Sequence, residues 1–197
     1  MIIIGITGGI ASGKSATSKY IKSLAYKLYD CDTIAHDIFD SNEVQKEIAS
    51  TFNIKGDIKR EEISKIVFND KNKMEELNNI MRKRITLKMI EILNSDENNK
   101  EELVFFDVPL LYEWHLYDMF KYVIFVYVDR NTQIERLVNR DKISKDYALK
   151  KLEAQIDIED KFTLAERRHD LIIDNNADLA NLYKEIDRVL REIKNDF

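Results

Sequence analysis

Apolar residues along the chain follow two patterns. Short apolar runs of roughly four to eight residues, bounded by glycine or polar residues, are typical of buried strands. We expect such strands at 2–6, 103–106 and 122–128, a shorter one at 171–173, and a weak one at 27–29, which reads Lys27-Leu28-Tyr29. Between them, apolar positions recur at spacings of three and four, which predicts helices. The clearest series is Met74, Leu77, Ile80, Met81, Ile85, Met89, Ile92 and Leu93.

The order of these segments predicts the fold class. We expect helices at 14–27, 33–95, 131–168 and 178–194. Strands that alternate with helices predict an α/β fold with a doubly wound, parallel, five-stranded sheet. We expect a single domain over residues 1–197, with residues 33–95 as a helical insertion. Ligands of such sheets bind beyond the carboxyl ends of the strands, where Asp32, Asp107 and a glycine-rich segment fall.

Composition and charge narrow the class of partner. Of the 197 residues 44% are hydrophobic, which is enough for a sizeable core, and the net charge is −5. Nucleic-acid-binding proteins are more often basic, so we expect no nucleic-acid partner. The single cysteine, Cys31, allows no intrachain disulfide. We expect no leader before Ile2-Ile3-Ile4, and no apolar run reaches the roughly 20 residues that span a bilayer. We expect a cytoplasmic monomer with no membrane contact.

The glycine-rich segment matches the phosphate-binding pattern G-x-x-x-x-G-K-[ST] in full. It reads Gly8-Gly9-Ile10-Ala11-Ser12-Gly13-Lys14-Ser15. Glycines allow the backbone N–H groups to point inward around phosphate, and the helix that follows adds its positive dipole end. Lys14 would reach the β- and γ-phosphates and the Ser15 hydroxyl would bind Mg²⁺. Because the segment follows a strand and opens a helix, we predict a P-loop that binds ATP and Mg²⁺.

The chain lacks the sequence signatures of other classes of P-loop protein. A GTPase switch needs Asp-x-x-Gly after a later strand, but the only glycine beyond the first thirteen residues is Gly56, and position 53 is Asn53. The Asn-Lys-x-Asp motif for guanine is also missing. A small-molecule kinase remains. It could phosphorylate a nucleoside, a nucleoside monophosphate, shikimate or a related acceptor, and a nucleotide-binding sensor without turnover is the alternative from another class.

Four stretches of the sequence indicate which small-molecule kinase family the chain resembles. They are residues 5–15, Asp30-Cys31-Asp32, Val108-Pro109-Leu110-Leu111-Tyr112-Glu113, and Gln133-Ile134-Glu135-Arg136-Leu137-Val138-Asn139-Arg140 with Ala154-Gln155. In these stretches the chain resembles the dephospho-CoA kinases along nearly its full length. The resemblance implies transfer of the γ-phosphate of ATP to the 3′-hydroxyl of dephospho-CoA, the last step of coenzyme A synthesis. The chain departs from that family at Arg82-Lys83, where His-Pro is usual.

Two carboxylates have candidate roles in the reaction. Phosphoryl transfer to an alcohol needs a carboxylate that orients the hydroxyl and accepts its proton, and by resemblance Asp32 is this base. The structural alternative is a helix N-cap, because Thr33 onward is predicted helical. A pure nucleotide sensor would need no base there. Asp107 follows an apolar strand and would hold Mg²⁺, or else it is an ordinary strand-end turn residue.

Arginines mark the beginning of a lid. By resemblance, residues 131–168 form this lid, and residues 33–95 hold the acceptor. Arg136 and Arg140 lie one helical turn apart and share a face, and at least Arg140 is expected to reach the phosphates. The alternative is a solvated ion pair with Glu135 or Asp141.

The predicted site residues fall into four sets. The catalytic set is Lys14, Asp32 and Arg140. The ATP-binding set is Gly9, Ile10, Ala11, Ser12, Gly13, Lys14, Ser15, Ala16, Arg136 and Arg140. The acceptor-binding set is Thr7, Asp32, Pro109, Leu110, Leu111 and Glu113. The metal ligands are Ser15 and Asp107.

Overall fold

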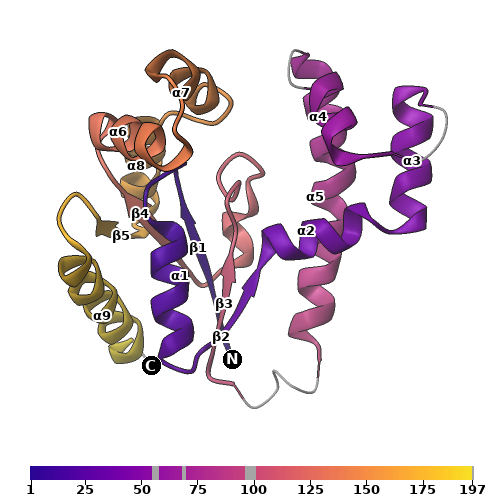
Figure 1. Cartoon of the computed structure of the whole chain (residues 1–197). Coiled ribbons are helices and arrows are strands. Elements are labelled where there is room, and N and C mark those ends of the chain that lie inside the picture. Colours follow the sequence, from indigo (N-terminus) through magenta and orange to yellow (C-terminus); the bar gives the residue numbers. More distant parts are fainter. Residues whose placement is uncertain (55–57, 68–69, 96–100, 197) are drawn as a thin grey trace. The chain divides into compact units, whose positions relative to one another are not determined.

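The computed structural model describes residues 1–54, 58–67, 70–95 and 101–196. The chain divides into two compact units, residues 1–30 with 100–197, and residues 31–99. The predicted helical insertion at 33–95 falls within the second unit, and its residues 55–57 and 68–69 lie outside the described residues. Figure 1 shows the strands in the first unit and only helices in the described part of the second.

The first unit is built on the predicted five-stranded parallel sheet. Its strands are β1 (Ile2–Gly8), β2 (Lys27–Asp30), β3 (Leu103–Asp107), β4 (Tyr122–Tyr127) and β5 (Leu171–Asp174). Their order across the sheet is β2-β3-β1-β4-β5, and every neighbouring pair is parallel. Each predicted strand is therefore confirmed, with its ends moved by one or two residues.

Helices cover both faces of this sheet, which confirms the doubly wound α/β prediction. On one face, α1 (Lys14–Ser23) and α9 (Leu179–Asn195) pack on alternate strand residues such as Ile4 and Phe105. Side chains of a strand alternate between the two faces, so Phe125 and Tyr127 point to the other one. There Phe125 meets the ring of Tyr112, and Tyr127 meets Phe162 of α8 (Ile158–Arg168).

One helix is shorter than its sequence pattern predicted. We expected a helix over 14–27, but α1 ends at Ser23. The backbone of Ala25 has a φ of 65°, in the left-handed region that a helix cannot continue through, and β2 begins at Lys27. The apolar residues at 24–29 thus belong to a turn and to strand β2, and not to the helix.

The predicted helical segment 131–168 consists of three helices with different anchors. They are α6 (Arg130–Asp141), α7 (Lys145–Leu152) and α8. Outside this segment, a short 3₁₀ helix, η1 (Leu116–Met119), precedes β4. Helix α8 packs on β4 and β5, and it buries Ile158 and Ala165. Helix α7 packs on α6 around a small separate cluster of Leu137, Ala148 and Leu152. The segment is therefore anchored most firmly at its end.

The described part of the second unit consists of four helices. They are α2 (Cys31–Phe39), α3 (Asn42–Phe52), α4 (Arg60–Val67) and α5 (Lys71–Leu93). Helix α5 packs against the other three and buries Ile80, Met81, Ile85 and Met89 of the predicted apolar series. It runs without a break through Arg82-Lys83, because no proline interrupts its hydrogen bonds there.

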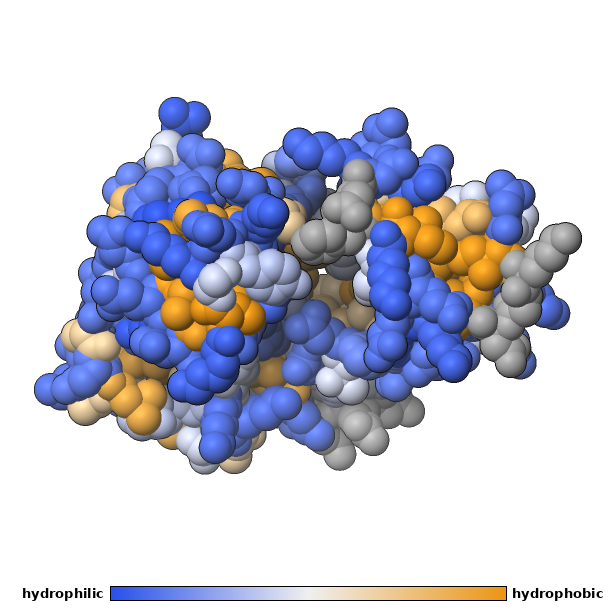
Figure 2. Space-filling view, turned by 45° about the horizontal axis from the view of Figure 1, so that its top comes forward, coloured by the Kyte–Doolittle hydropathy of each residue, from blue (hydrophilic) through white to orange (hydrophobic). Residues whose placement is uncertain are grey.

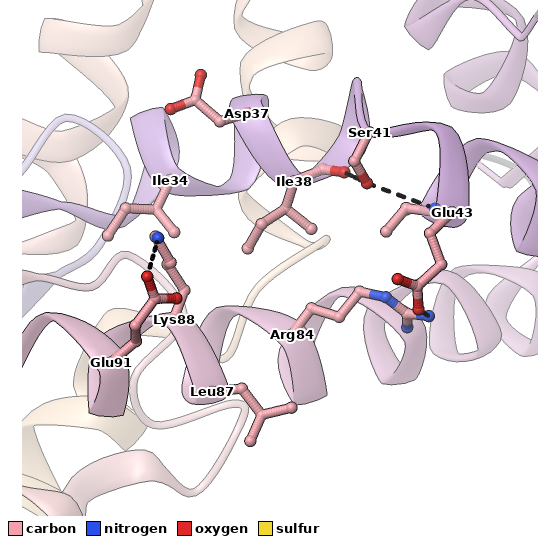
Figure 3. A pocket seen from close by; sticks show the side chains of 10 residues that line it. Ile34, Asp37, Ile38, Ser41, Glu43, Arg84, Leu87, Lys88 and Glu91 are labelled. Carbon is pink, nitrogen blue, oxygen red and sulfur yellow. Dashed lines mark hydrogen bonds and ion pairs between the residues drawn. The ribbon is translucent and has the colours of Figure 1, made fainter.

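A groove of about 460 Å³ lies along α2 and α5 of the second unit. Figure 3 shows Ile34 and Ile38 of α2 pointing toward α5, whereas Leu87 of α5, which also lines the groove, points away from α2. At one end Lys88 pairs with Glu91 at 2.7 Å, and at the other Arg84 pairs with Glu43 at 3.4 Å. The groove therefore has an apolar floor between charged ends.

Among the described residues, the exposed large apolar side chains are scattered over both units. They are Met1, Leu24, Leu87, Ile90, Tyr147, Ile156 and Leu179. Figure 2 shows apolar patches separated by hydrophilic surface on the face that it draws. Single exposed apolar residues of this kind are normal in folded proteins. None of the described helices combines the length and the apolar character that crossing a membrane would require.

Candidate active site

The phosphate loop, Gly8–Ser15, joins β1 to α1 at the carboxyl edge of the sheet. Two of its residues have left-handed backbone, Ala11 with a φ of 61° and Gly13 with a φ of 99°. The N–H of Ser12 donates to the Gly9 carbonyl oxygen at 3.1 Å and closes a tight turn. Alternation of ordinary and left-handed backbone brings successive N–H groups to one side, where they form a concave anion site.

Helix α1 differs at its first turn from six other helices of the described chain. In α3, α5, α6, α7, α8 and α9, a serine or aspartate side chain accepts a backbone N–H and caps the helix. In α1 the capping position is Gly13, which has no side chain, and no side-chain hydrogen bond caps the helix. The first amides of a helix have no intrahelical acceptor. At α1 they are suited to bind an anion such as phosphate.

Lys14 and Asp107 form an ion pair across the end of the sheet. The other carboxylate oxygen of Asp107 accepts a 2.6 Å hydrogen bond from the hydroxyl of Ser18. Asp107 is buried, with 4% of its surface exposed, and its Cα is in register with Ile6 of β1. The predicted phosphate lysine and the predicted metal-side carboxylate thus lie together, and Ser18 supports the carboxylate.

The Ser12 hydroxyl provides a further polar atom in the phosphate loop. It is buried, and it has no hydrogen-bond partner among the described residues. A buried hydroxyl without a partner costs free energy in the empty site, so a bound acceptor would restore its hydrogen bond. This atom fits a loop that holds phosphate oxygens.

The segment after β3 holds most of the predicted acceptor-binding residues. The Thr7 hydroxyl donates to the Pro109 carbonyl oxygen at 3.4 Å and ties this segment to β1. Leu111 is fully buried and packs beside Gly5, so it belongs to the core, whereas Pro109 and Leu110 are half-buried. Of the two leucines, Leu110 is therefore the one with surface to offer a ligand.

Glu113 has a partner that its sequence context did not suggest. Its carboxylate lies 2.7 Å from the ammonium of Lys161 in α8, and it also accepts the Ile156 N–H at 3.3 Å. Lys161 is fully buried. A buried ammonium is costly unless it is paired, so Glu113 and Lys161 fix α8 to the segment after β3. A contact between Glu113 and the acceptor stays a prediction.

The two predicted lid arginines have different environments. Arg136 is half-buried and donates to the Asn175 carbonyl oxygen at 2.9 Å. Arg140 is exposed and donates through Nε to Asp141 at 2.7 Å. The hydrogen bonds that Arg140 and Lys151 donate lower the pKa of Asp141 to about 2. The ion pair with Asp141 that the sequence left as an alternative for Arg140 is present.

Asp32 lies in the first turn of α2, in the second unit. Because α2 begins at Cys31, Asp32 is the second helical residue and does not precede the helix, as an N-cap would. Its role as the base stays a prediction.

Four polar residues at this edge of the first unit had no role in the sequence prediction. They are Ser18, Gln133, Lys161 and Asn175. Gln133 and Asn175 both donate to backbone carbonyl oxygens of the phosphate loop. The only signal for Asn175 was its place directly after the last strand, the same kind of position that marked Asp32 and Asp107.

Comparison with known proteins gives consistent matches. The family profile described as dephospho-CoA kinase matches residues 2–181. A curated dephospho-CoA kinase from Fusobacterium nucleatum is 37% identical, with 98% of this chain and 99% of the relative covered. One from Listeria monocytogenes is 35% identical, with 93% and 92% covered. The solved dephospho-CoA kinase of Campylobacter jejuni is 33% identical, with a TM-score of 0.70 and coverage of 99% and 98%.

Proposed function

The chain belongs to the dephospho-CoA kinase family, and from this premise we propose that it transfers the γ-phosphate of ATP to the 3′-hydroxyl of dephospho-CoA. The products are coenzyme A and ADP. The observation that carries this proposal is the match of the family profile to residues 2–181, a span that includes the complete phosphate loop. A cytoplasmic location and a monomeric state stay predictions from the sequence.

Lys14 and the phosphate loop are proposed to bind and polarise the triphosphate. The inward N–H groups and the first amides of α1 would hold the β-phosphate, and the Ser12 hydroxyl would donate to an adjacent oxygen. The Lys14 ammonium already lies at this edge, paired with Asp107. Its charge would counter the negative charge that develops on the transferred phosphoryl group.

The residues beside the loop fit Mg²⁺. Magnesium prefers oxygen ligands, and in kinases it is usually held by one or two protein oxygens together with substrate phosphates. The Ser15 hydroxyl is exposed in the first turn of α1, and Asp107 supplies a carboxylate. No group of three or more His, Cys, Asp or Glu among the described residues could hold a metal alone. We therefore assign Ser15 and Asp107 as the protein's contribution to a metal that also needs ATP, where it would neutralise phosphate charge.

The second unit is proposed to contribute the base and to bind the acceptor. Asp32 follows the last residue of β2 by two positions, and Asp30 is in register with Asp107. The 3′-hydroxyl oxygen of the acceptor would attack the γ-phosphorus, and the bond between the γ-phosphorus and the β-phosphate oxygen would break. The Asp32 carboxylate would accept the proton of that hydroxyl during the attack. The apolar floor of the groove in Figure 3 suits an uncharged arm of an acceptor better than its phosphates.

Lid closure is proposed to bring Arg140 to the phosphates. Closing excludes water and supplies a positive charge. Since α8 is fixed to β4, β5 and Glu113, we expect the moving part of residues 131–168 to centre on α7 and its connections.

We expect Arg140→Ala to lower kcat by roughly 10²-fold or more, given the effects known for arginines that stabilise phosphoryl transfer. A non-hydrolysable ATP analogue with Mg²⁺ should slow proteolysis and amide exchange at 142–157 in the parent protein, and less so in the variant. Arg167→Ala, which removes an exposed arginine of α8, is the matched control. If Arg140→Ala leaves both rate and protection intact, Arg140 is only the surface partner of Asp141.

The acceptor is identified by a screen of ATP-dependent ADP release. The candidates are dephospho-CoA, adenosine, AMP, cytidine, uridine and shikimate, since related P-loop kinases use acceptors of these kinds. Of these candidates, we expect only dephospho-CoA to support rapid ADP release. Preference for another acceptor would assign a different small-molecule kinase, and nucleotide binding without any product would indicate a sensor.

A further inference from the structure

The carbonyl groups of the phosphate loop need hydrogen-bond donors. When the N–H groups of a loop point inward around an anion, carbonyl groups of the same loop point outward into the protein, and a buried carbonyl requires a partner. In this protein two of them are served by side-chain amides. Gln133 Nε2 donates to the Ile10 carbonyl oxygen at 2.8 Å, and Asn175 Nδ2 donates to the Ser12 carbonyl oxygen at 2.7 Å.

Both amides are buried and held from other elements of the first unit. Gln133 lies near the start of α6 with 2% of its surface exposed, and Asn175 follows β5 with 6% exposed. The backbone N–H of Asn175 donates to the Tyr127 carbonyl oxygen at 2.8 Å, and its carbonyl accepts the bond from Arg136. Hydrogen bonds to β4 and α6 thus fix the backbone of Asn175, from which its side chain extends to the phosphate loop.

The two loop glycines that face these amides have no room for a side chain. A Cβ on Gly9 would come within 2.6 Å of Gln133 Nε2, and a Cβ on Gly13 would overlap Asn175 Nδ2. Gly13 also has the left-handed backbone that favours glycine. At both positions glycine lets a side-chain amide approach the loop backbone closely. Each amide is therefore matched to one glycine.

We propose that Gln133 and Asn175, called the amide pair from here on, are positioning residues for nucleotide binding. By holding the Ile10 and Ser12 carbonyl groups outward, the amide pair keeps the N–H groups of the loop directed at the β- and γ-phosphates. The nucleotide meets a loop that is already ordered, so less conformational freedom is lost on binding. This inference deepens the proposed function, because it concerns the nucleotide site of that reaction.

The test replaces each donor by an acceptor of the same shape, in Gln133→Glu and Asn175→Asp. A carboxylate facing a carbonyl oxygen repels it, and the loop carbonyl is left buried without a donor. We expect the Kd for ADP, measured by calorimetry, to rise about tenfold or more. The KM for dephospho-CoA should stay unchanged. The unfolding temperature without nucleotide should fall in these two variants, because a buried carboxylate without a partner destabilises the fold.

Matched controls separate loss of the donor from added charge. Asn176→Asp adds the same charge one residue away at an exposed position, and Asn139→Asp does so on α6. Both controls should bind ADP as the parent does. Gln133→Met and Asn175→Ala remove the donors without adding charge, and they should weaken ADP binding in the same direction.

Two results would overturn the inference. One is parental affinity for ADP in folded variants of either kind. The other is loss of the fold in both kinds of variant, which would make the amide pair part of the general core. ADP binding requires no acceptor. A chain that failed to phosphorylate dephospho-CoA would therefore refute the proposed function, and the ADP affinities of the variants would still test the role of the amide pair.

Discussion

Replacing Lys14 with alanine is expected to lower kcat/KM for ATP on the order of 10³-fold, the upper range for removal of one group that stabilises developing charge. The ammonium of Lys14 lies at the phosphate loop, where a positive charge counters the charge on the transferred phosphoryl group. A steady-state ADP-release assay measures this loss. Lys19→Ala, at an exposed position of the same helix, should keep parental turnover.

The structure adds an effect on stability to this variant. Lys14 and the Ser18 hydroxyl are the partners of the Asp107 carboxylate among the described side chains, so without Lys14 the buried carboxylate keeps only Ser18 there. A buried charge that loses its counter-ion destabilises the fold. We therefore expect the unfolding temperature to fall in Lys14→Ala and to recover in Lys14→Ala combined with Asp107→Asn. Turnover should stay low in both. Recovery of turnover in the double variant, or near-parental turnover in the single one, would refute the role of Lys14.

Asp32→Asn is expected to lower kcat by a factor on the order of 10²–10⁴, the range for loss of a general base. Asparagine keeps the size of the side chain and loses its ability to accept the proton of the acceptor hydroxyl. Affinity for ATP should change little, because the phosphate loop is untouched. Pre-steady-state measurement of ADP and product formation reports the chemical step.

Asp37→Asn provides the matched control for Asp32. Asp37 lies on the same helix, is exposed and lines the groove of Figure 3, so its substitution changes the charge of α2 equally. We expect parental kcat from this control. If Asp32→Asn lowers only the unfolding temperature and kcat holds, Asp32 serves the first turn of α2 and another group acts as the base.

The sequence predicted the sheet well because its signals are local. The strands β3 and β4 are continuous apolar runs with polar residues at their ends, and the weaker signal of β2 comes only from Leu28 and Tyr29. The end of each strand marks the edge where ligands bind. The phosphate motif sits between one such strand and a helix, so the meeting of Lys14 and Asp107 at that edge followed from the parallel topology.

The residues that the sequence missed act through contacts between distant segments. Gln133 and Asn175 reach loop carbonyl groups 123 and 163 positions away, and neither lies in a pattern that reveals a backbone partner. Lys161 stands in a highly charged helix, where a lysine is normally solvated, yet it is buried against Glu113. For the same reason no sequence signal separated α8 from the rest of the predicted lid, residues 131–168, although α8 is anchored to the sheet.

The most direct test of the central claim compares dephospho-CoA with its 3′-deoxy analogue in one ADP-release assay, with the products identified by mass spectrometry. With dephospho-CoA, we predict ADP and coenzyme A in equal amounts. The analogue should compete with dephospho-CoA for binding but release no ADP above background, because it lacks the hydroxyl oxygen that attacks the γ-phosphorus. Equal ADP release from the analogue, together with a phosphorylated product, would contradict transfer to the 3′-hydroxyl.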